Sequence, residues 1–170
     1  MQPKVTSPAT KGIFISLILI VYSLVTYFTG QTLNDNLKWL GTAIFFVAII
    51  MSCISYAKQL NGNLTFGNDF AHGFKTAAAV TAIMCLYTII FFMVIAPDMK
   101  GKILDVARQK MIEQKNLTGD QIDQGVALVS KLFYIVTVGS IILIYLLCGV
   151  IAALIGAAVA KKNPDYIPEQ

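Results

Sequence analysis

Three ionisable side chains lie close together in the sequence, just before a long apolar segment. Asp69, His72 and Lys75 are spaced at i, i+3 and i+6, and on a helix this spacing places neighbouring members on one face. His72 is the only histidine in the chain, and histidine ionises closest to neutral pH. Ionisable clusters at the end of a membrane helix can serve a proton or ion path. These residues are therefore the candidate polar cluster.

A structural interpretation of the same three residues is favoured over a functional one. An aspartate in the first turn of a helix is stabilised by the helix dipole. Histidine and lysine side chains near a helix end can extend to the membrane surface. None of the three lies deep in the uncharged segment that covers residues 76 to 96. We therefore expect Asp69 to support the helix start, and His72 and Lys75 to reach the surface.

The sequence carries no motif for catalysis or cofactor binding. It has no phosphate-binding loop, dinucleotide fingerprint, zinc-protease motif or serine elbow. Its three cysteines fall in different apolar segments, at spacings that match no metal or redox motif: Cys53, Cys85 and Cys148. We expect a protein that is not an enzyme, with no catalytic residue, cofactor or metal.

The composition is that of a membrane protein. Of 170 residues, 56% are hydrophobic and 13% are charged, whereas globular domains carry about 25% charged residues. A helix that crosses a bilayer needs about 20 apolar residues. Four segments reach this length: 12–30, 37–57, 69–96 and 132–160. The sequence predicts an all-α integral membrane protein, a single domain over residues 1–170 built as two antiparallel helix hairpins in contact with the lipid bilayer.

The polar segment at residues 99–131 predicts an extramembrane helical hairpin. Ile103, Ala107 and Met111 recur at helical spacing among charged residues, which is typical of an amphipathic helix that lies on the membrane or against a partner. Thr118 and Gln121 match a capping box, so a second helix should begin near Gly119. Because no breaker follows, this helix is expected to continue through residue 160.

The sequence also predicts the ends of the third membrane helix and the packing face of the fourth. Asn68 is expected to cap the third membrane helix, and Pro97 should end it. The last apolar segment carries two ladders of small residues that let helices approach closely, and packing within the monomer is favoured over a dimer seam. The ladders are Gly149, Ala153 and Ala157, and Ala152, Gly156 and Ala160.

Charge placement predicts orientation and excludes nucleic acid as a partner. The net charge is +4, but the basic residues are scattered, and most lie beside apolar segments. Four spans put both termini on one side, and basic residues favour the cytoplasmic side. The basic residues that favour cytoplasmic termini lie near the two ends of the chain and in the loop after the second span: Lys4, Lys11, Lys58, Lys161 and Lys162. Six basic residues within 99–131 argue for the opposite orientation, but the first helix usually dominates.

The order of several motifs resembles the DUF4199 family, four-helix membrane proteins of Bacteroidota with no assigned activity. The motifs are the stretch from Gly62 to Phe74, the helix that ends at Ala96-Pro97-Asp98, the stretch from Leu117 to Asp123, and the small-residue helix that closes on Lys161-Lys162. The resemblance implies an inner-membrane protein and supplies no catalytic residues. The resemblance implies small or polar residues around positions 69–71, which would make Asp69 and His72 particular to this sequence.

Three functional hypotheses follow. The first is a non-enzymatic interaction or assembly component of the bacterial inner membrane, which binds another membrane protein through residues 99–131. The alternative is a small transporter or channel subunit that works as a homo-oligomer assembled through the fourth helix. That alternative predicts a water path lined by hydroxyl side chains: Ser52, Ser55, Thr76, Thr81, Thr88, Thr137 and Ser140. A membrane enzyme that depends on His72 is a third and weaker hypothesis.

Overall fold

The computed structural model describes residues 5–113 and 117–164. Within these ranges every regular element is a helix, which confirms the predicted all-α class. The elements are α1 (Pro8–Phe28), α2 (Asp35–Gln59), α3 (Phe66–Ile90), the π-helix η1 (Phe91–Ile95), α4 (Met99–Glu113), α5 (Gly119–Lys131) and α6 (Phe133–Val159). Four helical segments are long and apolar enough to cross a membrane: α1, α2, α3 with η1, and α6.

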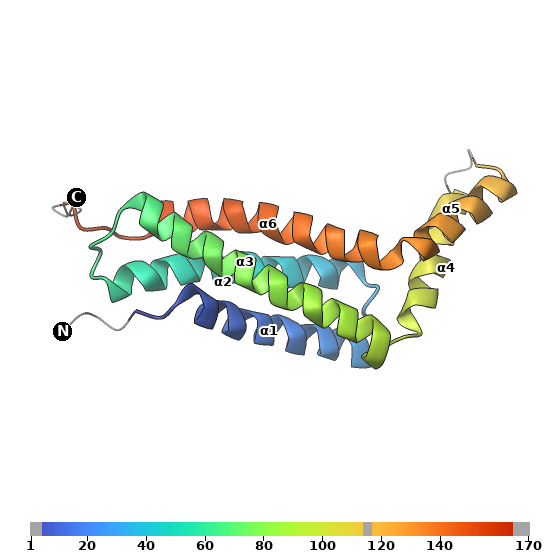
Figure 1. Cartoon of the computed structure of the whole chain (residues 1–170), viewed down its shortest axis with the longest axis horizontal. Helices are drawn as coiled ribbons and strands as arrows, with labels where there is room; N and C mark the ends of the chain where they lie inside the picture. The colour runs from blue at the N-terminus through green and yellow to red at the C-terminus, as the bar shows by residue number, and fades with distance from the viewer. Residues whose placement is uncertain (1–4, 114–116, 165–170) are drawn as a thin grey trace. The chain divides into compact units, whose positions relative to one another are not determined.

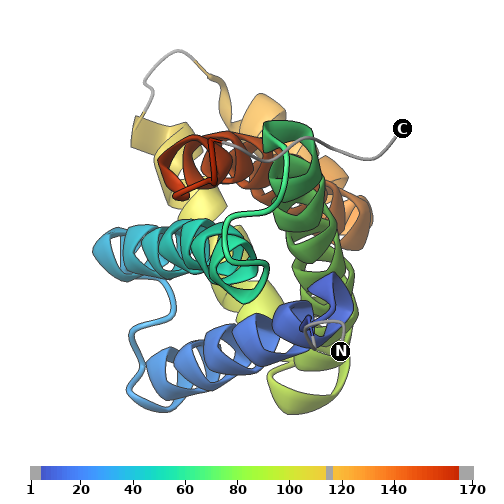
Figure 2. The same cartoon turned by 90° about the vertical axis from the view of Figure 1, so that its left-hand side faces the viewer.

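The chain divides into two compact units, and the prediction of a single domain stays a prediction. The first unit holds the chain up to Met84 and from Leu143 onward, and the second holds Cys85–Ile142. In the first unit α1, α2, α3 and α6 run side by side (Figure 1). Here α1 begins and α6 ends at the same end of the unit, as four spans require. Figure 2 looks onto this end, which we call the terminal end.

Polar caps make the helices longer than the apolar segments. Ser7 accepts a hydrogen bond from the Thr10 N–H, and Pro8 occupies the first helical position, so α1 begins four residues before the predicted start. Asn34 caps α2 in the same way. The prediction that Asn68 caps the third membrane helix was wrong. Thr65 accepts the Asn68 N–H at 3.2 Å, so α3 begins at Phe66 and Asn68 lies inside it.

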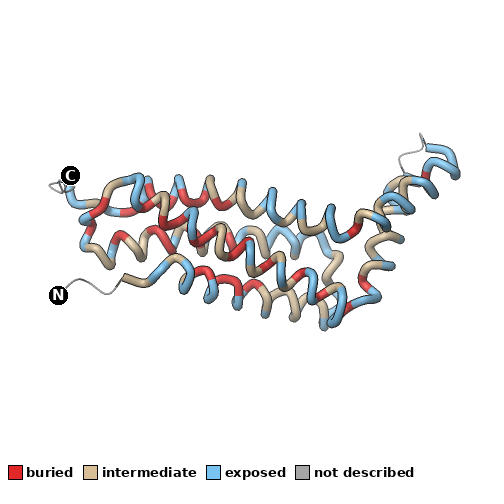
Figure 3. The backbone as a smooth tube through the Cα atoms, in the orientation of Figure 1, coloured by how far each residue is buried: buried red, intermediate tan, exposed pale blue. Residues whose placement is uncertain are grey.

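Small residues bring α2, α3 and α6 into close contact in the first unit. A Cβ on Gly149 would lie 2.6 Å from that of Ala77, and one on Gly73 would overlap the Cys53 sulfur. A Cβ on Gly156 of α6 would lie 2.8 Å from the Cβ of Cys53. Both predicted ladders therefore face helices of the same chain. Their alanines are buried, and buried positions follow the inward faces of these helices (Figure 3): Ala152, Ala153, Ala157 and Ala160.

In the second unit α4 and α5 form a helical hairpin. The Thr118–Gln121 capping box predicted from the sequence is present at the start of α5. Arg108 on α4 pairs with Asp123 on α5. The Met111 sulfur lies 3.2 Å from the position of a Cβ on Gly125, so the Met111 side chain packs closely against α5 at this glycine.

The third span ends as a π-helix. The Ala96 N–H donates to the Phe91 carbonyl, five residues earlier, at 2.7 Å. Pro97 follows and has no N–H with which to continue the ladder. The π-turn thus ends the span one residue before the predicted end at residue 96.

The expected continuous helix from Gly119 to residue 160 was wrong. Leu132 leaves helical geometry with φ −97° and ψ 9°, so α5 ends at Lys131 and α6 begins at Phe133. Phe133 is buried, and its ring meets that of Phe92 edge-on at 5.0 Å between centroids. No breaker residue marks the site, and the interruption accompanies this tertiary contact.

Candidate functional site

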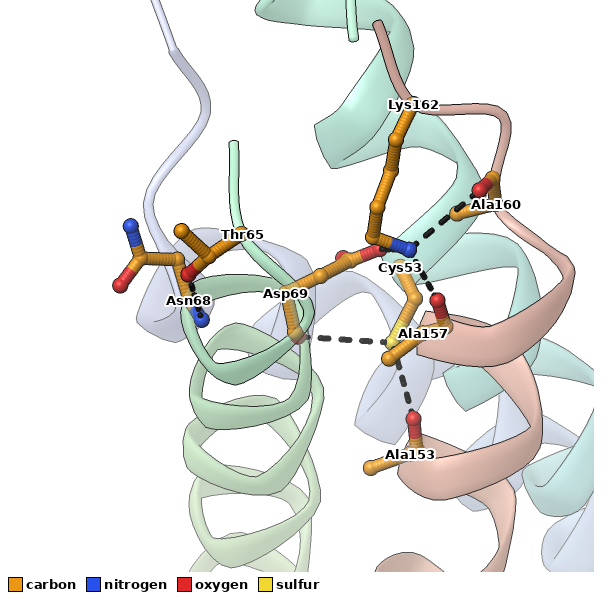
Figure 4. A network of polar contacts seen from close by, with 8 residues as sticks. All are labelled: Cys53, Thr65, Asn68, Asp69, Ala153, Ala157, Ala160 and Lys162. Carbon is orange, nitrogen blue, oxygen red and sulfur yellow. Dashed lines mark hydrogen bonds and ion pairs between the residues drawn. The ribbon is translucent and has the colours of Figure 1, made fainter. Parts of the chain in front are cut away.

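Asp69 is a buried carboxylate in the first unit. It lies in the first turns of α3, at the terminal end, and is 0% exposed. Neither carboxylate oxygen accepts a hydrogen bond from a residue within the described ranges. The nearest compensating charge is Lys162, whose Nζ lies 3.9 Å from Oδ2. The two side chains point toward each other in Figure 4.

Lys162 follows α6 and folds back onto the last turn of that helix. Its Nζ donates to the carbonyls of Ala157 and Ala160, and it lies 5.7 Å from the centroid of the Phe66 ring. The last carbonyls of a helix carry the negative end of its dipole and attract a cation. The ammonium group therefore joins the end of α6 to the start of α3, with its side chain 24% exposed.

The segment after α6 is fixed on the loop between α2 and α3. The Asn163 N–H donates to the Gly62 carbonyl at 2.9 Å, and Asn163 Nδ2 donates to Asn63 Oδ1 at 3.0 Å. Gly62 has φ +79°, and a Cβ there would lie 2.7 Å from the Asn163 nitrogen. A glycine is required at this position for both reasons. These contacts bring Lys162 to Asp69.

His72 lies in a different environment from Asp69. Its imidazole stacks on the Tyr56 ring with 3.9 Å between centroids and 9° between planes. It is only 5% exposed, so the expectation that it extends to the membrane surface was wrong. Its Nε2 is buried without a hydrogen-bond partner among the residues described. The Lys11 Nζ lies 5.8 Å from the centroid of the Tyr56 ring. It also donates a hydrogen bond to the Ser52 carbonyl at 2.9 Å.

The predicted cluster thus separates into three surroundings. Asp69 pairs with Lys162, His72 packs on Tyr56, and Lys75 is exposed. No sequence motif indicated that Lys162 or Lys11 would join the buried polar groups. The only signal was that both lie at ends of apolar segments which an even number of spans brings to one side.

The chemistry of the site is that of a buried ion pair between helix ends. In the described part of the chain, no three His, Cys, Asp or Glu side chains are placed to hold a metal ion. Cys53 lies against the backbone carbonyls of Asp69 and Ala153, at 3.8 and 3.9 Å from its sulfur. The contacts connect α2, α3 and α6, and their direct effect is to fix these helices together.

Four apolar helices define a multi-pass membrane protein by their length and composition. The sequence model of a protein family of unknown function, DUF4199, matches residues 10–162. The match covers nearly the whole chain, and the protein belongs to the DUF4199 family. No curated protein and no solved structure matches it.

Proposed function

We propose that the protein is a non-enzymatic interaction or assembly component of a membrane, and that the α4–α5 hairpin binds its partner. The observation that carries the proposal is the hairpin itself. It lies outside the four candidate spans, yet it forms its own interhelical contacts through Arg108 with Asp123 and Met111 with Gly125. A stretch with internal contacts can present a defined surface to another protein.

The surface of the hairpin carries apolar side chains among charged ones. Ile112, Leu117 and Leu128 are exposed large apolar residues, and all three lie outside the spans. Exposed apolar residues on the spans can face lipid, whereas these three lie outside the candidate spans. Apolar residues within a polar rim are a common feature of protein interfaces. They are the candidate contact residues.

The hydroxyl side chains of the spans support a packed bundle over the transporter alternative. Thr76 and Thr81 are buried, and each donates to the carbonyl four residues earlier, at 2.9 and 2.8 Å. Ser140 donates to the Val136 carbonyl at 2.7 Å. Hydroxyls used in this way do not need a water path to satisfy them. The small-residue ladders of α6 are also occupied within the chain, which disfavours assembly through them.

The proposed location is the inner membrane of a bacterium, with cytoplasmic termini. Lys11, Lys58, Lys75, Lys161 and Lys162 lie on the elements that meet at the terminal end of the first unit. Cytoplasmic flanks of membrane helices carry such an excess of lysine. The basic residues of α4 and α5 are partly offset by their acidic neighbours, although acidic residues have little influence on orientation.

Affinity purification from native membranes tests the proposed function. Deletion of residues 103–125, and separately the triple change of Ile112, Leu117 and Leu128 to serine, should remove or weaken one specific co-purifying protein. The matched control is Lys38→Gln, an exposed position in α2. This control should retain the partner. Retention of every co-purifying protein after the deletion would contradict the proposal.

A further inference from the structure

A groove in the first unit lies between the end of α2 and the segment after α6. Its volume is about 480 Å³, and we call it the lysine groove. The side chains that matter here are those of Lys58, Asn61, Lys161, Lys162 and Asn163, which all line it. The hydrogen bonds of Asn163 to the α2–α3 loop hold one wall against the other.

The groove is strongly basic. Three of its lining residues are lysines, and no described residue that lines it is acidic. Asp69 offsets the charge of Lys162. Lys58 and Lys161 are exposed, and neither is paired with an acidic residue in the part of the chain that the structure describes. Among the described residues, the groove therefore presents two ammonium groups without an acidic partner, together with amide side chains that can donate hydrogen bonds.

The groove lies where two membrane spans end. Helix α2 ends at Gln59 and α6 ends at Val159, and the lining residues lie at or directly beyond these ends. The polar headgroup layer begins where the apolar part of a span ends. Lysines at such positions place their ammonium groups among lipid phosphates. A headgroup would thus reach the groove without leaving the plane of the membrane.

We propose that the lysine groove binds the phosphate of an anionic phospholipid whose headgroup carries no amine. Ammonium groups bind phosphate as point charges, and basic pockets between membrane helices hold anionic headgroups. A zwitterionic headgroup fits less well, because its own cation would face Lys58 and Lys161. The lipid would also cover the groove and stabilise the contact between the α2–α3 loop and the end of the chain.

Native mass spectrometry of the full chain tests this site. The protein in detergent micelles is given equal amounts of phosphatidylglycerol and phosphatidylcholine, and the bound lipid is counted. We expect a preference for phosphatidylglycerol. Each of Lys58→Gln and Lys161→Gln should weaken that binding about fivefold, and the double change about thirtyfold, as expected for charges at a lipid surface. The matched control, Lys38→Gln with Lys110→Gln, removes two exposed charges elsewhere and should leave the preference unchanged.

Three results would overturn the proposal. The first is equal binding of the two lipids, or a preference that survives the double change of Lys58 and Lys161. The second is displacement of phosphatidylglycerol by millimolar inorganic phosphate, which would make a free anion the ligand. The third is binding only after residues 165–170 are removed. That segment contains Asp165 and Glu169, and such a result would make the chain's own end the occupant.

Discussion

Replacement of Lys162 by methionine should destabilise the first unit by about 3 kcal/mol. The Lys162 ammonium lies 3.9 Å from Asp69, whose carboxylate is fully buried without a hydrogen bond from any described residue. Two unit charges 4 Å apart interact by about 4 kcal/mol at an effective dielectric constant of about 20. Since the lysine side chain is 24% exposed, water screens part of this energy. Loss of one partner of a buried pair costs about 3–5 kcal/mol.

A double-mutant cycle separates the ion pair from other effects of the substitution. Asp69→Asn should lower the free energy of unfolding by only about 1 kcal/mol. In that variant the Lys162 ammonium still donates hydrogen bonds to the carbonyls of Ala157 and Ala160 and remains partly solvated. The double variant should cost about 2 kcal/mol, which leaves a coupling of about 2 kcal/mol. Unfolding free energies in detergent micelles, followed by circular dichroism, provide the measurement. Lys161→Met is the matched control, because that neighbour is exposed, and it should change stability by less than about 0.5 kcal/mol.

Two results would contradict a stabilising ion pair between Lys162 and Asp69. One is a Lys162→Met variant as stable as the Lys161→Met control. The other is full additivity of the Lys162 and Asp69 substitutions, which would mean that the two side chains do not interact.

Two further predictions concern other parts of the chain. Gly73→Ala should destabilise the protein by about 1–3 kcal/mol, because the added Cβ would overlap the Cys53 sulfur. The control is Gly139→Ala, whose Cβ would meet nothing within 4 Å, so this change should be neutral or stabilising. Thermal unfolding of the two variants provides the comparison. A hydrogen bond from Lys102 holds the pKa of Asp98 below its ordinary value of 3.8, so the stabilisation from this pair is present above about pH 4 and is lost as pH falls through the lowered pKa. Lys102→Gln should bring the carboxyl titration, followed by NMR, back toward the ordinary value, and an unchanged titration would contradict this cause.

The apolar segments were sufficient to predict the all-α class and the four candidate membrane spans. Length and hydrophobicity decide whether a helix can cross a bilayer, so four spans could be read from the sequence. The ends were less predictable, because Ser7 and Asn34 extend α1 and α2 through caps that hydrophobicity does not detect. At Leu132 local propensity favoured a continuous helix, but the contact of Phe133 with Phe92 accompanies an interruption.

The candidate site was predictable only in part. Spacing on α3 identified Asp69 and His72, but helical spacing cannot tell which neighbouring helix each side chain meets. The pairing of Asp69 with Lys162 depends on the docking of Asn163 on Gly62, between segments far apart in the sequence. The burial of His72 depends in the same way on Tyr56 of α2. Such pairings follow from which helices are adjacent, and the sequence alone does not specify that.

Site-specific photo-crosslinking in native membranes shows whether the α4–α5 hairpin binds another protein. A photoreactive residue is placed at Lys110 or Ile112 on the α4–α5 hairpin, with a matched probe at Val47, an exposed position of α2. Both hairpin probes should capture the same heterologous protein, and the probe at Val47 should not capture it. Self-crosslinks alone, or no protein crosslink, would contradict a partner-binding hairpin and would favour the oligomeric transporter, to be examined by flux into liposomes.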